Sequence, residues 1–188
     1  MKHPMTKAAA LALTIAPLMV AGVGGGSAGA ATPSHVTEVM KILTTGTLKG
    51  SGQQPKITNS SWTIHKGQTV TVKIISYDDG TAPLMGQYMK YSMVMGTSGG
   101  TEMAGGKKVS NVSDINIAHT FTIAKLGFNM PIPVAPTGKS IVVTATFKAT
   151  KTGTFVWNCY APCGTGATGM NGAMKAMGWM TGKVTVAP

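Results

Sequence analysis

The sequence predicts an all-β protein, a sandwich or barrel built from short strands. Segments rich in Thr, Val and Ile alternate apolar and polar residues, which is the period of a half-buried strand. The 25 glycines and 10 prolines fall between these segments and mark turns. No long segment shows the apolar period of a helix, so a fold of several short strands is favoured.

The expected strands are distributed along the whole chain after its N-terminal segment. Residues 36–43 could form either a short helix or a strand. Residues 60–64 and 68–75 alternate clearly, and Lys66-Gly67 between them is typical of a turn. Further strands are expected at residues 117–123, 140–147, 154–158 and 181–186.

Residues 78–114 interrupt this pattern. The segment is rich in Gly, Ser, Met and Tyr, and we expect one or two irregular strands in it, near residues 91–96. A loop of this length inside a compact domain is often functional, and is otherwise simply mobile. We call residues 78–114 the excursion.

The first 30 residues have the features of a secretory signal peptide. Residues 1–7 carry two lysines, residues 8–23 are apolar, and small residues lead to Ala30. We expect cleavage after Ala30, which leaves one domain, residues 31–188, in the periplasm or outside the cell. The alternative is a retained membrane anchor, which Pro17 and the glycines that follow disfavour. No later stretch approaches the ~20 apolar residues of a membrane span, so the mature protein is not expected to be an integral membrane protein.

The charge is strongly basic. The formal net charge is +11, from 16 basic and 5 acidic residues, and every basic residue is lysine. The lysines are scattered and no arginine offers forked contacts to phosphate or guanine, so no nucleic acid partner is expected. A basic surface fits an acidic protein partner, and the other interpretation is an ordinary solvated lysine surface.

The chain has two cysteines, Cys159 and Cys163, with Pro162 between them. In an exported protein such a pair could form a disulfide. The closed loop would be so short that the bridge would stabilise little. A soft-metal chelate is the other interpretation, because thiolates select copper, zinc or iron–sulfur clusters. Zinc usually takes four Cys or His ligands, which this chain cannot easily supply.

Methionine and histidine favour copper. Four of the 14 methionines follow the cysteines, at positions 170, 174, 177 and 180. Methionines at such spacing often fill a core, but the glycines among them argue against a regular helix. His119 opens an expected strand, where a histidine taken alone is more often structural. Together, His, Cys and Met are the ligand types of blue-copper sites.

The segment from residue 114 to residue 186 resembles the copper domain of cytochrome oxidase subunit II, a cupredoxin. Ile117-Ala-His119-Thr-Phe looks like the strand that carries the family's first histidine ligand. Leu126-Gly-Phe-Asn-Met-Pro-Ile-Pro133 looks like its connecting loop, and Lys151 to Cys159 like the strand that leads to the metal. Cys159-x-x-x-Cys163-Gly resembles the binuclear copper motif.

The resemblance implies a cupredoxin-like Greek-key β-sandwich with copper as its cofactor. The implied ligands are His119, Cys159, Cys163 and a methionine, which is Met170 or Met180 depending on the alignment. The family's second histidine is missing, because Ala167 or Met177 stands in its place. His35 or His65 could replace it only by an unexpected topology. We therefore expect a variant, soft, mononuclear site with a high reduction potential.

The expected function is one-electron transfer to or from a respiratory redox partner, by a monomeric protein that is not itself an enzyme. No general acid–base pair, nucleophile elbow or hydrolase motif is visible. Two alternatives stay open. The protein could be a copper(I) carrier or chaperone, or a metal-free structural module with a Cys159–Cys163 disulfide.

Overall fold

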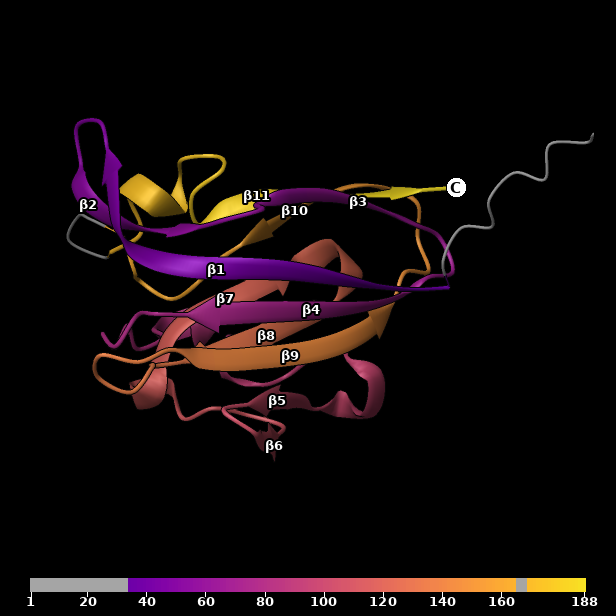
Figure 1. Cartoon of the computed structure of the whole chain (residues 1–188), viewed down its shortest axis with the longest axis horizontal. Helices are drawn as coiled ribbons and strands as arrows, with labels where there is room; N and C mark the ends of the chain where they lie inside the picture. Colours follow the sequence, from indigo (N-terminus) through magenta and orange to yellow (C-terminus); the bar gives the residue numbers. More distant parts are fainter. Residues whose placement is uncertain (1–33, 165–168) are drawn as a thin grey trace, which may run out of the picture. The chain divides into compact units, whose positions relative to one another are not determined.

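The computed structural model describes residues 34–164 and 169–188, which form two β-sheets (Figure 1). The predicted signal peptide, residues 1–30, and Ala167 lie outside the described residues. Over the described ranges the regular elements are strands and short 3₁₀ turns, and no helix there has the length and apolar character that a membrane crossing requires.

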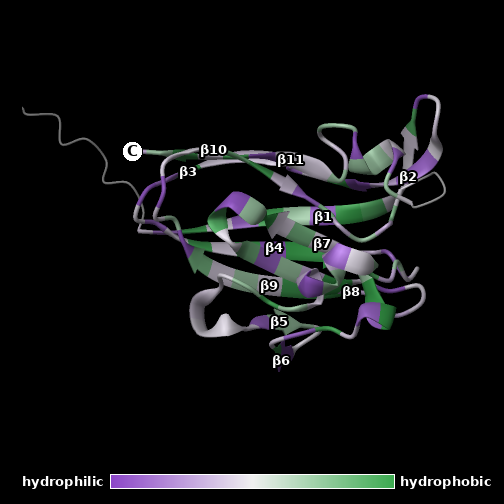
Figure 2. Ribbon diagram, turned by 180° about the vertical axis from the view of Figure 1, so that it is seen from behind, coloured by the Kyte–Doolittle hydropathy of each residue, from purple (hydrophilic) through white to green (hydrophobic). Residues whose placement is uncertain are grey.

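The first sheet contains six strands. Their order is β2 (Gly52–Ile57), β1 (His35–Leu48), β4 (Thr69–Ser76), β9 (Ile141–Lys148), β5 (Glu102–Ala104) and β6 (Lys107–Val109). Strand β1 runs parallel to β4, and β4 runs antiparallel to β9. Alternate residues of β4 are buried, as the period of its sequence predicts, and the same alternation is visible in Figure 2.

The second sheet contains five strands. Their order is β3 (Ser61–His65), β11 (Thr181–Ala187), β10 (Gly153–Asn158), β7 (Ile117–Ile123) and β8 (Phe128–Pro133). The chain passes repeatedly from one sheet to the other, so most neighbours within a sheet are not consecutive in sequence. The two sheets confirm the all-β sandwich in the predicted fold class.

Aromatic side chains of the second sheet fill the core. Phe121 on β7 packs against Trp157 on β10 with 4.7 Å between ring centroids, and both residues are fully buried. The indole Nε1–H of Trp157 donates a hydrogen bond of 2.7 Å to the carbonyl oxygen of Ser60, which satisfies its buried polar atom. Strands β7 and β10, which carry the site described below, are therefore held in a rigid part of the molecule.

Two segments differ from the sequence prediction. Residues 36–43 belong to a strand, β1, which resolves the choice left open between helix and strand. The expected connecting loop is wrong, because Phe128–Pro133 forms strand β8. Its prolines suggested a loop, but β8 lies at the edge of the second sheet, where a missing backbone N–H costs no ladder hydrogen bond. Strand β2 was not predicted either.

The excursion contains β5, β6 and two 3₁₀ helices, η1 (Gly86–Ser92) and η2 (Ser98–Gly100). In place of the strand expected at residues 91–96, Met93 and Met95 form isolated bridges after η1. Buried Asn129 on β8 anchors them, since its Nδ2 donates to the carbonyl oxygens of Tyr91 at 2.9 Å and Met93 at 2.6 Å. Its Oδ1 accepts a 2.6 Å hydrogen bond from Thr122 on β7. The excursion is thus fastened to the strand pair that carries His119.

Three more 3₁₀ helices connect the strands of the described chain. They are η3 (Asp114–Asn116), η4 (Ala124–Leu126) and η5 (Gly172–Met174). The last of these matters for the site, because its three residues turn the segment after the cysteines back toward the core, and Ala173 and Met174 become buried.

Candidate metal centre

The structure brings His119, Cys159 and Cys163 together. One possible ligand atom from each of these side chains lies within 4.8 Å of the other two. His119 sits on β7, and Cys159 directly follows β10, which pairs with β7 through Asn158 and Thr122. His119 and Cys159 are buried, and Cys163 is partly exposed. The pairing of β7 with β10 therefore positions His119 and Cys159. The short turn after Cys159 brings Cys163 back to the same place.

A thioether completes the group of soft donors. The two cysteines are free, with 3.4 Å between their sulfurs, far longer than the ~2.05 Å of a disulfide bond. The Cys163 sulfur also lies 3.1 Å from Sδ of Met174. The cluster of His119, Cys159, Cys163 and Met174 thus offers one imidazole, two thiols and one thioether. We call these four residues the soft-donor cluster.

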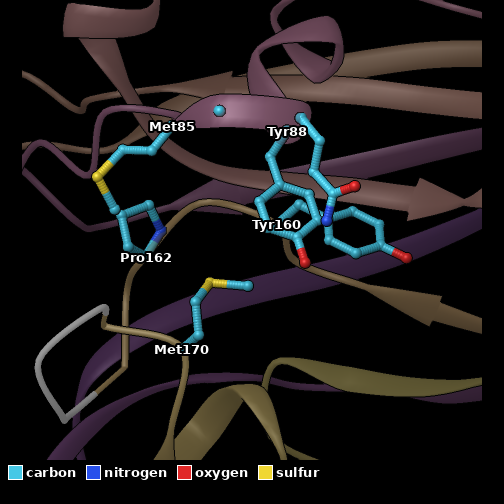
Figure 3. Close-up of a pocket in the computed structure, with 7 residues that line it drawn as sticks. Met85, Tyr88, Tyr160, Pro162 and Met170 are labelled. Carbon is cyan, nitrogen blue, oxygen red and sulfur yellow. The ribbon is translucent and has the colours of Figure 1, made fainter.

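The two methionines expected as ligands, Met170 and Met180, lie in different surroundings from each other. Met180 is fully buried in the hydrophobic core, and its backbone carbonyl accepts a 3.0 Å hydrogen bond from the N–H of Cys159. Met170 lines a surface cavity next to Pro162 and Tyr160 (Figure 3). In the described part of the chain, the methionine sulfur that contacts a cysteine is that of Met174. Sequence spacing alone could not single it out, because η5 is too short to leave a periodic signal.

Asp78 is a functional residue that sequence reasoning missed. Its Oδ2 lies 2.8 Å from Nε2 of His119, and its Oδ1 accepts a hydrogen bond of 2.9 Å from the backbone N–H of Gly80. Only Asp114 is close to His119 in sequence, whereas Asp78 follows the end of β4 in the other sheet. With Nε2 engaged in this way, Nδ1 of His119 faces Cys159 at 3.9 Å.

The hydrogen bonds among Asp78, His119 and the two cysteines shift the pKa values of the site. Burial alone would lower the pKa of His119, but the hydrogen bonds to Asp78 and Cys159 outweigh it and raise this pKa to about 9. Burial would likewise raise the pKa of Cys159, but hydrogen bonds from Cys163, His119 and the Thr120 backbone lower it well below its usual value. The hydrogen bond to Cys159, together with burial, raises the pKa of Cys163. Of the two thiols, Cys159 is therefore the one whose surroundings favour the thiolate.

A stack of aromatic rings joins the turn between the cysteines to the excursion. Tyr160, the residue after Cys159, stacks on Tyr91 with 4.5 Å between ring centroids and on Tyr88 with 5.1 Å. Its backbone N–H donates a 2.9 Å hydrogen bond to Oγ1 of Thr120 on β7. The stack fixes the turn between the two cysteines and brings the excursion against the site.

The other described histidines lie outside the cluster. His35 contacts Oγ1 of Thr71 at 2.9 Å, and His65 contacts the carbonyl oxygen of Pro188 at 3.0 Å. Both are exposed. Within residues 34–164 and 169–188, the group that could hold a metal therefore has a single imidazole, from His119.

Comparison with known proteins gives structural neighbours only. No protein-family model and no curated protein sequence matches the chain. A structure of the copper protein rusticyanin aligns at 19% identity, covering 82% of this chain and 79% of that one, with a TM-score of 0.39. A structure of rusticyanin from Thiobacillus ferrooxidans aligns at 19% identity with the same coverage of both chains and a TM-score of 0.37. Auracyanin B aligns at 14% identity over 84% of this chain and 92% of that one, with a TM-score of 0.33.

Proposed function

We propose that this chain is an exported copper protein of the cupredoxin type that passes single electrons to or from a redox partner. The observation that carries the proposal is the soft-donor cluster, in which one imidazole and three sulfurs converge at the end of two paired core strands. Bound copper would supply the one-electron chemistry, by alternating between Cu(I) and Cu(II).

The donor set fits copper better than zinc. Structural zinc is held by four Cys or His ligands, and the cluster provides three such residues and a thioether. Thiolate and thioether select Cu(I), while an imidazole suits either oxidation state. The thiolate of Cys159 is already favoured in the folded protein, so part of the cost of deprotonating a metal ligand is met by the fold.

The protein's own residues hold and orient the donors. Asp78 fixes the orientation of the His119 ring, as carboxylates commonly do for metal-binding histidines. The Thr120 N–H donates to the Cys159 sulfur at 3.3 Å, which stabilises negative charge there. A second imidazole would stabilise Cu(II), and its absence from the cluster leads us to propose a high reduction potential.

A copper(I) carrier is the second candidate, and the sulfur content of the cluster favours it. Two thiols and a thioether can hold Cu(I) without any redox change. The third candidate is a metal-free module with a Cys159–Cys163 disulfide. The sulfurs would have to close from 3.4 Å to bonding distance, and mass spectrometry showing a loss of two hydrogens would identify that form.

The partner and the compartment belong to the proposal as well. We propose a respiratory partner with an acidic surface, because the lysines give this chain a formal charge of +11 and attraction between opposite charges speeds encounter. We also propose a periplasmic or extracellular location. The finer likeness to the copper domain of cytochrome oxidase subunit II rests on the sequence resemblance of residues 114–186.

Spectroscopy of the copper-loaded protein tests the function. Electron transfer predicts an intense visible absorption, a Cu(II) electron paramagnetic resonance signal and a reversible one-electron wave in voltammetry. A colourless protein that holds Cu(I) tightly and gives no reversible wave would favour the carrier. A potential as low as that of an ordinary binuclear centre would contradict the mononuclear, one-imidazole site.

A further inference from the structure

A second group of sulfur donors lies at the surface beside the soft-donor cluster. It belongs to a cavity of ≈ 440 Å³. The lining residues are Met85, Gly86, Gln87, Tyr88, Tyr160, Pro162 and Met170. Two of them are methionines that come from distant parts of the sequence, one before η1 and one after Cys163. The folded chain brings both thioethers to the same opening.

The two thioethers are accessible from solvent. Met85 is 52% exposed, and Met170 is partly buried. Figure 3 shows Met85 entering from the side of the excursion and Met170 from the opposite side, with Pro162 and the stacked rings of Tyr88 and Tyr160 at the walls. Leucine side chains would pack equally well at these two positions. Packing alone therefore does not explain why both are methionine.

The wall of the cavity is also the turn that bears the cysteines. Tyr160 and Pro162 lie between Cys159 and Cys163 in the chain. Burial of the sulfur-bearing residues increases from the cavity inward, from Met85 at 52% exposed, through partly exposed Cys163, to Cys159 at 1%. The donors also change inward, from the thioethers of Met85 and Met170 at the cavity to the cysteine sulfurs of the cluster.

We propose that Met85 and Met170 form a loading site for Cu(I), which captures the ion and passes it to the soft-donor cluster. The inference rests on the proposed copper function. Neutral thioethers bind Cu(I) in preference to hard divalent ions, and the stacked rings of Tyr88 and Tyr160 line the cavity beside them. The ligand is therefore a monovalent soft ion rather than Cu(II) or zinc.

Transfer from the loading site is a ligand exchange. Bonds from Cu(I) to the two thioethers break, and bonds from Cu(I) to the cysteine sulfurs form. The oxidation state of copper does not change, and the Cys163 thiol releases its proton to water as it becomes a ligand. Because thiolates bind Cu(I) more strongly than thioethers do, the exchange runs inward without any added reactant.

The test is a titration with Ag(I), a redox-inert soft ion, and with Cu(I) supplied from a coloured chelator. The double variant Met85→Leu/Met170→Leu keeps the volume and apolar character of both side chains and removes the sulfurs. The matched control is Met93→Leu/Met103→Leu, which alters methionines that are 48% and 42% exposed outside the cavity lining.

We expect the unaltered protein to bind a strongly held and a weakly held Ag(I). The Met85/Met170 variant loses the weakly held ion and takes up Cu(I) into the cluster more slowly, while the control variant does neither. Unchanged Ag(I) stoichiometry and unchanged loading rate in the Met85/Met170 variant would overturn the loading site.

A further variant separates this inference from the proposed function. Cys159→Ser/Cys163→Ser removes the thiols of the cluster and leaves Met85 and Met170 in place. If the weakly held Ag(I) survives in this variant and disappears when Met85 and Met170 are also replaced, the loading site stands, even if the cluster itself proves to bind no copper. If the unaltered protein binds only the strongly held ion, the loading site is refuted while the proposed function is kept.

Discussion

Asp78 follows β4 of the first sheet and His119 lies on β7 of the second, 41 positions later, yet their side chains meet at 2.8 Å. The contact leaves Nδ1 of His119 directed at Cys159. It also places a carboxylate from the beginning of the excursion directly behind the candidate metal ligand.

Replacing Asp78 by Asn should weaken copper binding by about 10–100-fold, the usual cost of losing a partner that orients a metal-binding histidine. The amide can still contact the ring but carries no charge to support it. Competition with a Cu(I) chelator measures the change. Asp79→Asn is the control, since Asp79 is the exposed neighbour, and equal affinities for the two variants would contradict the role of Asp78.

Met174→Leu should lower Cu(I) affinity because the thioether next to Cys163 is lost. Loss of a residue that only orients a ligand typically costs about tenfold or more, so the loss of a donor should cost at least as much. Met180→Leu should leave the affinity unchanged, since Met180 is fully buried in the core and a swap of similar volume costs little there. Measuring both variants against the same chelator decides between the two methionines, and the reverse result would restore Met180 as the ligand.

Asn129→Ala should destabilise the fold by roughly 3–5 kcal/mol, because buried groups on three partners lose their hydrogen bonds. Urea unfolding measures the free energy, and limited proteolysis should show cleavage within the excursion that Asn129 anchors. Asn116→Ala, at an exposed position, is the control. Proteolysis as slow as in the unaltered protein would show that other contacts hold the excursion.

Glu102 should make the protein more stable as the solution becomes more acidic. The residue is 2% exposed, neither carboxylate oxygen has a hydrogen-bond partner among the described residues, and burial raises its pKa from 4.5 to about 8. Because the folded pKa is the higher one, the folded state holds the proton more tightly. The stabilising contribution is complete below about pH 4.5 and is lost as the pH rises through about 8.

Thermal unfolding between pH 5 and pH 8, roughly the interval between the two pKa values, checks this sign. Glu102→Gln should reduce the dependence on pH, most clearly below about pH 6.5, since the amide is neutral throughout, whereas the raised pKa of His119 keeps a loss of stability above that pH. Glu38→Gln, at a partly exposed carboxylate, should retain it. A stability that rises with pH in the unaltered protein and is unaffected by Glu102→Gln would contradict the prediction.

Local sequence pattern was sufficient for most strands but not for all of the site. The alternation in residues 68–75 and the turn at Lys66-Gly67 led directly to β4 and its connection. Strand β8 was missed because Pro131 and Pro133 are compatible with a strand only at a sheet edge, and edge position is a property of the whole sheet.

The site shows the same division between local and long-range information. Cys159 and Cys163 are close in sequence, and their resemblance to a copper motif predicted that they lie beside His119. Asp78 could not be foreseen, because its contact with His119 depends on how the two sheets pack. Met174 was one of four similar methionines, and only the turn η5 distinguishes it.

The copper content of the purified protein tests the central claim most directly. After loading with Cu(I) under reducing conditions and exhaustive dialysis, the unaltered protein should retain copper, and Cys159→Ser and His119→Ala should lose it while remaining folded. An unaltered protein that retains no copper, and whose mass as purified, before any reductant is added, is lower by the two hydrogens of a Cys159–Cys163 disulfide, would contradict the claim.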